Sequence, residues 1–487
     1  MLVNSIVSTT DLIRFLPEII LTLMGTFLMV MDPILNRRSS DAFGHLSLVA
    51  LIAALGGSVY AYTEAGSAFG GMLVVDGFAT FFRVLVIVVG ILTVLSSYRF
   101  LECQDAETSE YHALLLFSIA GQCLMAASND LIMVFIGLEI SSIASYVLVG
   151  YLRDDKRANE AALKYFLLGS FATAFFLYGV ALIYGTTGSI NLSAVRGILS
   201  GQDAPEVVFI GLAAALMFVG LGFKVSASPF QIWAPDVYQG APTPVTAFLS
   251  TGPKAAAFAV FLRIFMTAFE PISNTWQPLV WISALLSITI GNFAALLQSN
   301  VKRMLAYSSI AHAGYVMVAL TARSEIGTSA AMFYLAAYAF MNIGAFAVVS
   351  HLSGKGERYQ NVDDFAGLAQ KQPLTAAMLT IFMLSLIGVP LTGGFFGKFY
   401  IFKAALESHL VWLTVLGLLN SAVAAYYYLR ILVMMYMHEP SKASSELEPL
   451  PLGLGTALIV PAVATLFLGI FPSWVLDFAG KSAALVK

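Results

Sequence analysis

Five ionisable residues lie inside segments that are otherwise apolar and long enough to cross a lipid bilayer. They are Lys164, Lys224, Lys254, Lys398 and Glu139, the last of which lies in the run LIMVFIGLEISSIASYVLVGYL. A charged side chain at the centre of a bilayer costs about 2.5–3.5 kcal/mol on insertion scales, and such residues usually mark a path for ions or protons. Burial favours the neutral amine of a lysine, whereas a nearby carboxylate favours the charged form. A membrane lysine can therefore gain and release a proton, whereas an arginine stays charged.

The composition places these residues in a polytopic membrane protein. Of the 487 residues, 59% are hydrophobic and 11% are charged, whereas a soluble domain carries about 25% charged residues. Two cysteines, Cys103 and Cys123, are too few for an iron–sulfur cluster with four thiolate ligands. The sequence has no CxxC motif, no P-loop and no GxGxxG motif after a strand. We therefore expect no metal, cofactor or redox centre in this chain, so that any redox chemistry belongs to another chain.

Hydropathy predicts an all-α polytopic membrane protein with about fourteen transmembrane helices, because each apolar run approaches the ~20 residues that a bilayer requires. No soluble domain fits between the runs, so we expect residues 1–487 to form a single membrane domain. The expected spans are 12–34, 45–63, 76–98, 111–128, 130–151, 160–186, 206–226, 241–268, 276–298, 303–321, 326–352, 373–405, 409–437 and 453–476.

Basic residues predict the orientation of these spans. If the N-terminus lies outside, twelve Lys and Arg residues fall in the inner loops, including Arg37, Arg38 and Lys302, and five fall outside, including Lys487. This distribution fits the positive-inside rule with both termini on the outer, periplasmic side.

Two short matches at one offset indicate an internal repeat. SSIA occurs at 141–144 and 308–311, and LRI occurs at 262–264 and 429–431, so both are shifted by 167 residues. The shift predicts two inverted five-helix repeats, formed by helices 4–8 (111–268) and helices 9–13 (276–437), as in many transporters.

Two of the predicted helices contain a break near a lysine. Helix 7 reads GLGFKVSASPFQIWAPD, with Pro229 after Lys224, and helix 12 reads SLIGVPLTGGFFGKFYIF, with Pro390, Gly393 and Gly394 before its lysine. Proline removes a backbone donor and disrupts the preceding turn. The freed carbonyl groups are tolerated only inside protein or beside an aqueous cavity. Such a break beside a lysine is suited to proton transfer.

The block FKVSASPFQIWAPDVYQGAPTPVTAFLSTGPKAAAFAVFLRI resembles the antiporter-like subunits of respiratory complex I, and the subunit N branch of that family in particular. The segments VKRMLAYSSIAHAGY and GVPLTGGFFGKFY support the resemblance, which covers nearly the whole chain. It implies a proton-translocating membrane-arm subunit of an NADH:quinone oxidoreductase, a translocase, in a bacterial inner membrane. It also implies that partner subunits bind NADH, FMN, iron–sulfur clusters and quinone. The expected contacts are membrane lipids and subunits resembling K and M, with no nucleic acid.

The resemblance assigns roles to the five ionisable residues. Glu139 and Lys224 are similar to the family's ion pair on helices 5 and 7, whose opening and closing is thought to modulate proton affinity. Lys254 is similar to the central residue on helix 8, and Lys398 is similar to the helix 12 residue from which protons leave. Lys164 is similar to a helix 6 lysine near the ion pair. Protons would then pass from the cytoplasm to the periplasm through these residues and water.

Two of the candidate residues have an alternative interpretation from the sequence. His312 is either a satisfied core histidine or a relay group between Lys254 and Lys398. Lys164 follows Glu160 by four residues, a spacing at which the two form a structural pair on a helix.

Two further charged residues have an expected structural role. We expect Arg263 to serve structure or topology and Asp236 to cap a loop. For the whole chain, the alternative function is a cation/proton antiporter of the Mrp type, which has the same fold and charges as the resembled family.

Overall fold

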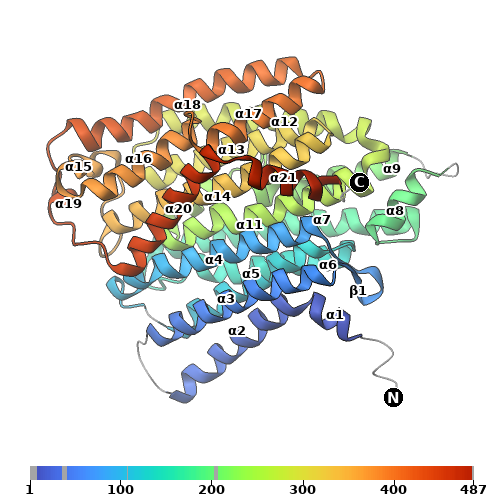
Figure 1. Cartoon of the computed structure of the whole chain (residues 1–487), viewed down its shortest axis with the longest axis horizontal. Coiled ribbons are helices and arrows are strands. Elements are labelled where there is room, and N and C mark those ends of the chain that lie inside the picture. Colours follow the sequence, from blue (N-terminus) through green and yellow to red (C-terminus); the bar gives the residue numbers. More distant parts are fainter. Residues whose placement is uncertain (1–7, 36–40, 107, 202–206, 485–487) are drawn as a thin grey trace.

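The computed structural model describes residues 8–35, 41–106, 108–201 and 207–484, and most of them are helical (Figure 1). Eleven helices within these ranges are long and apolar enough to cross a membrane, which confirms the all-α polytopic membrane fold. They are α3 (Asp41–Thr63), α4 (Gly77–Cys103), α6 (Leu131–Val149), α7 (Lys156–Thr187), α9 (Val207–Val225), α11 (Thr243–Arg263), α12 (Ser273–Leu296), α13 (Val301–Thr321), α14 (Glu325–Ser353), α18 (Val411–Met437) and α20 (Leu452–Ile470).

Further helices fill the remaining predicted spans. Residues 16–31 of α2 (Leu16–Leu35) and all of α16 (Pro373–Ile387) are shorter apolar helices. Helix α5 (Ser109–Ala127) coincides with the expected span at 111–128. The number of membrane crossings, about fourteen, stays a prediction.

Polar residues at the helix starts explain where several spans begin. Asp76 accepts a hydrogen bond of 2.7 Å from the backbone of Ala79 and caps α4. Asp130 caps α6 through the backbone of Ile132 at 2.9 Å, and Asn300 caps α13. Each side chain satisfies one of the backbone donors that a helix leaves free at its N-terminus.

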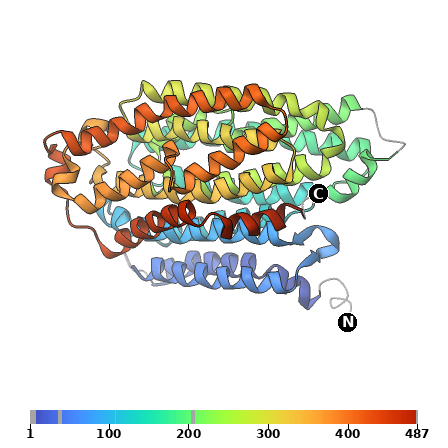
Figure 2. The ribbon, with the colours of Figure 1, turned by 45° about the horizontal axis from the view of Figure 1, so that its top comes forward.

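Three helices form the centre of the bundle. The most apolar stretches of α11, α13 and α14 are each 94% buried, whereas the corresponding stretch of α7 is 39% buried. Helices α2 and α3 form a layer along one edge (Figure 2). The central helices carry Lys254 and His312, which are therefore shielded from lipid by the surrounding helices.

Both predicted breaks coincide with gaps between helices. Pro229 lies between α9 and α10 (Trp233–Gly240), and Pro390 lies between α16 and α17 (Gly393–Glu407). Gly393 and Gly394 are the first two residues of α17 and lie just after the gap. Lys224 stands in the last turn of α9, and Lys398 stands in α17, six residues into the helix.

The structure also contains short elements that hydropathy does not reveal. Residues 66–75 form a small antiparallel hairpin, and residues 264–268 continue α11 as a π-helix. The elements are α1 (Thr9–Arg14), β1 (Gly66–Ala68), η2 (Phe69–Gly71), β2 (Leu73–Val75), α8 (Leu192–Leu199), η3 (Ile264–Ala268), η4 (Glu270–Ile272), η5 (Val362–Phe365), α15 (Leu368–Lys371), α19 (Lys442–Ser445) and α21 (Ser473–Ala483).

Two backbone bridges relate the halves of the chain. Asp130 pairs with Asn191, and Asn300 pairs with Asn361, so each bridge joins a helix cap to a residue 61 positions later. The two bridges are offset by 170 residues, close to the 167 of the sequence matches. They support the inverted repeat, which stays a prediction.

The first and last described helices lie at the same end of the bundle. Figure 1 shows α1 and α21 toward the right, opposite α15 and α19. This arrangement agrees with an even number of crossings. Arg37, Arg38, Lys487 and the two ends of the chain lie outside the described residues, so the side of the membrane that each end faces stays a prediction.

Candidate functional site

Lys254 lies in the central helix α11 and is 2% exposed. Its Nζ donates hydrogen bonds to the carbonyl oxygen and to the Oγ of Ser309 on α13, at 3.1 Å and 2.5 Å. The hydroxyl of Tyr238 on α10 lies 3.5 Å from the same Oγ. Neutral oxygens therefore hold this amine, and it lies where α10, α11 and α13 meet.

Lys224 contacts aromatic rings rather than the carboxylate of Glu139. Its Nζ donates a hydrogen bond of 3.3 Å to the Tyr146 hydroxyl and lies 5.4 Å from the ring centroid of Tyr165. The Oε1 atom of Glu139 is buried without a hydrogen-bond partner. Within the described ranges no ion pair joins the two residues, so this structure holds the expected pair open.

A small cavity lies beside Lys224. Its volume is 10 Å³, and its lining includes Ser141, Ser142, Ser145 and, from α11, Pro253. This is about the smallest space that accommodates one water molecule, and three hydroxyl groups supply the polar partners such a water needs. The cavity therefore extends from Lys224 toward the helix that carries Lys254.

Lys398 folds back onto the break that precedes it. Its Nζ donates to the carbonyl oxygens of Leu386 and Ile387 at 3.0 Å and 2.9 Å, and to Ser421 Oγ at 2.9 Å. The ring centroid of Tyr315 lies 4.8 Å away. The lysine thus satisfies carbonyl groups that the end of α16 leaves free, where the helix dipole favours a cation.

His312 belongs to a buried hydroxyl network between the two lysines. Its Nδ1 lies 2.5 Å from the Tyr334 hydroxyl, and its Nε2 lies 3.1 Å from the Tyr428 hydroxyl. Tyr428 also forms a hydrogen bond with Ser308, the neighbour of the Ser309 that holds Lys254. The geometry satisfies both ring nitrogens and also suits a relay, so both interpretations of this residue remain.

Lys164 is not a buried cation, and the structural pair with Glu160 that the sequence offered as the alternative is present. Its side chain is 43% exposed and pairs with Glu160 at 2.7 Å and with Asp236 at 3.0 Å. The reason is that α7 lies at the surface of the bundle and turns this residue outward. The expectation that Asp236 caps a loop was wrong, because Asp236 lies in α10 and also pairs with Arg303 at 2.6 Å.

Three side chains that accept hydrogen bonds from the buried lysines escaped the sequence analysis. Tyr146, Ser309 and Ser421 accept hydrogen bonds from Lys224, Lys254 and Lys398. Ser309 stands in the repeated SSIA motif, so the repeat was a usable signal for it. Tyr146 and Ser421 lie in apolar helices outside the matched segments and carry no comparable signal.

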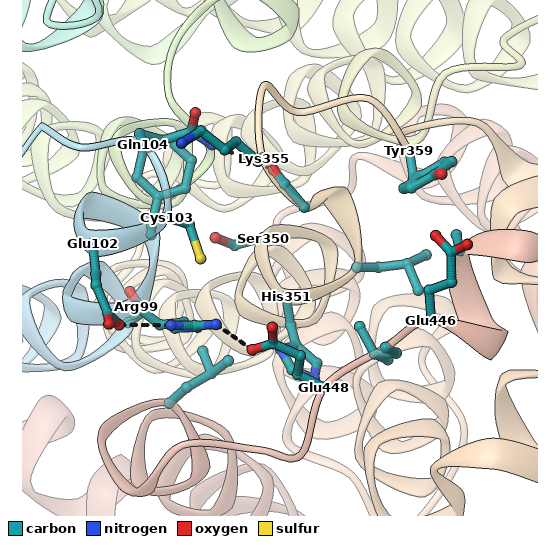
Figure 3. Close-up of a pocket in the computed structure, with 17 residues that line it drawn as sticks. Arg99, Glu102, Cys103, Gln104, Ser350, His351, Lys355, Tyr359, Glu446 and Glu448 are labelled. Atoms are coloured by element: carbon teal, nitrogen blue, oxygen red, sulfur yellow. Dashed lines mark hydrogen bonds and ion pairs between the residues drawn. The ribbon is translucent and has the colours of Figure 1, made fainter.

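A pocket of about 480 Å³ lies away from the buried lysines, at the opposite end of the bundle from α1 and α21. Figure 3 shows Arg99 between Glu102 and Glu448, so that an ion pair ties the segment before α20 to α4. None of the predicted site residues lines this pocket. Among the residues that the structure describes, no three His, Cys, Asp or Glu side chains gather closely enough to hold a metal ion.

Comparisons with known proteins agree with this architecture. The family model described as NADH:quinone oxidoreductase/Mrp antiporter matches residues 128–424. The NADH-quinone oxidoreductase subunit N 1 of Solibacter usitatus is 78% identical over 477 residues, which cover 98% of each chain. The subunit N 2 of Koribacter versatilis is 50% identical over 486 residues, with 98% of each chain covered.

Solved structures give the same result. A chain of respiratory complex I from Thermus thermophilus superposes with a TM-score of 0.82 at 35% identity, covering 95% of this chain and 99% of that one. A chain of the Mrp complex from Dietzia gives a TM-score of 0.84 at 22% identity, with 98% of each chain covered, which shows a shared fold. The chain belongs to the antiporter-like membrane subunits of NADH:quinone oxidoreductase, complex I, and within them to the subunit N family.

Proposed function

We propose that this chain carries protons from the cytoplasm to the periplasm through buried lysines, driven by NADH oxidation and quinone reduction in partner subunits. One observation carries the proposal: Lys224 and Lys254 are buried in spanning helices, Lys398 is buried in α17 after the second break, and all three donate to neutral oxygens. A buried ion pair leaves an uncompensated charge when one partner is neutralised. An amine held by neutral oxygens loses its proton without that penalty.

The contacts support a route in three steps. The first step joins Lys224 to Lys254 through a water in the cavity lined by Ser141 and Pro253. Glu139, whose Oε1 has no partner, closes onto Lys224 in another state and opens again to release the proton. An approaching carboxylate raises the proton affinity of an amine, so this movement controls when Lys224 holds its proton.

The later steps run along α13. Lys254 contacts Ser309, and the neighbouring Ser308 shares the Tyr428 hydroxyl with His312. Water between this network and Lys398 completes the path, and Lys398 releases the proton toward the outer side. We assign Lys164 a supporting role, because its exposed pair with Asp236 anchors α7 to α10 near the first lysine.

The assembly follows from the relatives. The Solibacter relative is named as a subunit of an NADH-quinone oxidoreductase, and the Thermus chain comes from a respiratory complex I. We infer that partner subunits hold NADH, FMN, the iron–sulfur clusters and quinone, and that the neighbours in the membrane resemble subunits K and M. We further infer a bacterial inner membrane location with both termini in the periplasm.

A cation/proton antiporter of the Mrp type is the second candidate, because the Dietzia chain has the same fold. Purification of the tagged chain from native membranes separates the two. We expect flavin and iron–sulfur absorbance and NADH-driven quinone reduction to copurify with it. Copurification without these centres, together with cation-dependent proton exchange in proteoliposomes, would replace this proposal with the antiporter.

A further inference from the structure

A buried ion pair outside the proposed path joins Lys302 to Glu357. The side chains are 0% and 6% exposed, and the charged atoms lie 3.1 Å apart. Lys302 stands in the first turn of α13, whereas Glu357 lies in the segment between α14 and η5. The pair therefore fixes a connecting segment to the centre of the bundle.

Each member of the pair also satisfies the end of a helix. Lys302 Nζ donates a hydrogen bond of 2.6 Å to the carbonyl oxygen of Ala241, the residue that ends α10. Glu357 Oε1 accepts a hydrogen bond of 2.9 Å from the backbone of Thr243, the first residue of α11, and another from its hydroxyl. The cation thus lies at a helix C-terminus and the anion at a helix N-terminus, as the helix dipoles favour.

The backbone at Glu357 supports a specific role for this contact. Its φ of 48° lies in the left-handed region, which is unfavourable for a residue with a Cβ atom. Residues persist in such conformations when the surrounding contacts impose them, and they cluster at functional positions. Pro242, which precedes α11, supplies no side-chain cap of its own, so Glu357 provides the cap from a distant part of the chain.

The pair and the Lys254 contact cross-link the same helices. Lys302 and Ser309 both lie on α13, seven residues or about 10 Å apart, on one face of the helix. Lys302 contacts the α10–α11 junction, and Ser309 contacts Lys254 further along α11. These two contacts restrict sliding of α13 along α11.

We propose that Lys302 and Glu357 are positioning residues for proton transfer, because they set the register of α13 against α11 and thereby the contact between Lys254 and Ser309. This inference rests on the proposed function of Lys254. The other end of α11 is fixed in a similar way, since Arg263 pairs with Asp76, the cap of α4, at 2.8 Å and donates to the carbonyl oxygen of Ala126. The helix that carries Lys254 is thus fixed at both ends.

A charge exchange tests the helix-end part of this inference. The double variant Lys302→Glu/Glu357→Lys keeps an ion pair but places the acid at the α10 C-terminus and the amine at the α11 N-terminus. We expect about a tenfold loss of quinone reduction and proton pumping in assembled complex for Glu357→Gln, and no recovery in the exchanged variant. Recovery to the parental rate would show that any ion pair suffices and would overturn the inference.

The control variant is Lys355→Ala. Lys355 lies two residues before Glu357 and forms an exposed pair with Asp105, so the variant should keep the parental rate.

A double-variant cycle with Ser309→Ala tests whether Glu357 acts through Ser309. If it does, Glu357→Gln should change the rate much less in the Ser309→Ala background than in the parent. Additive losses would assign Glu357 a role unrelated to Lys254 and overturn the inference. Parental rates in Glu357→Gln would also overturn the inference. If Lys254→Met abolishes pumping in the same experiment, the proposed function stays intact. Parental pumping by Lys254→Met would instead reject the proposed function itself.

Hydrogen–deuterium exchange in detergent-extracted membrane subunits decides the question if a variant does not assemble. Glu357→Ala removes the acceptor of the Thr243 amide, so the amides at the start of α11 should exchange at least about tenfold faster than in the parent. Unchanged exchange there would mean that Glu357 does not hold the helix end and would overturn the inference.

Discussion

Lys398 donates to the carbonyl oxygen of Ile387, the last residue of α16, across the break that separates α16 from its own helix α17. The same amine therefore holds the two halves of the broken span together and occupies the end of the proposed path. Loss of a proton from Lys398 would weaken the bond that closes the break, so we expect proton release and local geometry to be coupled at this residue.

Lys398→Met should stop proton release and loosen the break. The variant leaves the carbonyl groups of Leu386 and Ile387 without their donor, and each unsatisfied buried group costs about 1–3 kcal/mol. We expect a large loss of NADH-driven pumping and a lower thermal stability of the complex. The control is Lys403→Met on the same helix, which removes an exposed lysine that pairs with Glu407 at 3.8 Å and should pump at the parental rate. Equal pumping rates and thermal stabilities of the Lys398→Met and Lys403→Met complexes would refute the role of Lys398.

Tyr146→Phe should impair the first step while changing no charge. The substitution removes the hydroxyl that accepts the hydrogen bond from Lys224, and a hydrogen bond to a charged group contributes about 1.5–3 kcal/mol. We expect quinone reduction and pumping to fall together by about tenfold or more. Tyr178→Phe, which changes an exposed tyrosine on α7, is the matched control. Parental rates in Tyr146→Phe would show that the Lys224 contact is incidental.

Gly394 illustrates a limit of the sequence-based view of the break. The sequence predicts a break next to Gly394 but not how closely its two halves pack: a Cβ atom at Gly394 would lie 1.9 Å from the carbonyl oxygen of Ser385. We therefore expect Gly394→Ala to push the half-helices apart and reduce assembly on native gels. Gly455→Ala in α20, where a Cβ atom meets nothing within 4 Å, should assemble normally. Normal assembly of Gly394→Ala would mean that the half-helices are free to separate without loss.

The sequence was sufficient for features that depend on long patterns or rare residues. Apolar runs predict the spans, and the prolines at 229 and 390 predict the gaps between half-helices. The same signals do not show which way a helix faces, so the sequence left two interpretations of Lys164 open, whereas the structure shows an exposed side chain paired with Glu160. The neutral acceptors Tyr146 and Ser421 were missed because their role depends on packing between distant helices. The sequence also did not reveal that Lys224 contacts Tyr146 and not the carboxylate of Glu139.

Proton transfer through Lys254 is the central claim, and the rate of NADH-driven proton pumping in assembled complex tests it most directly. Lys254→Met and Lys254→Arg should be compared with the parent in sealed membrane vesicles, because arginine keeps the charge but, with a pKa above about 12, does not release its proton. We predict that both variants assemble and that both lose pumping and quinone reduction. Restoration of the parental pumping rate by Lys254→Arg would contradict the claim, since a fixed charge would then be sufficient at this position.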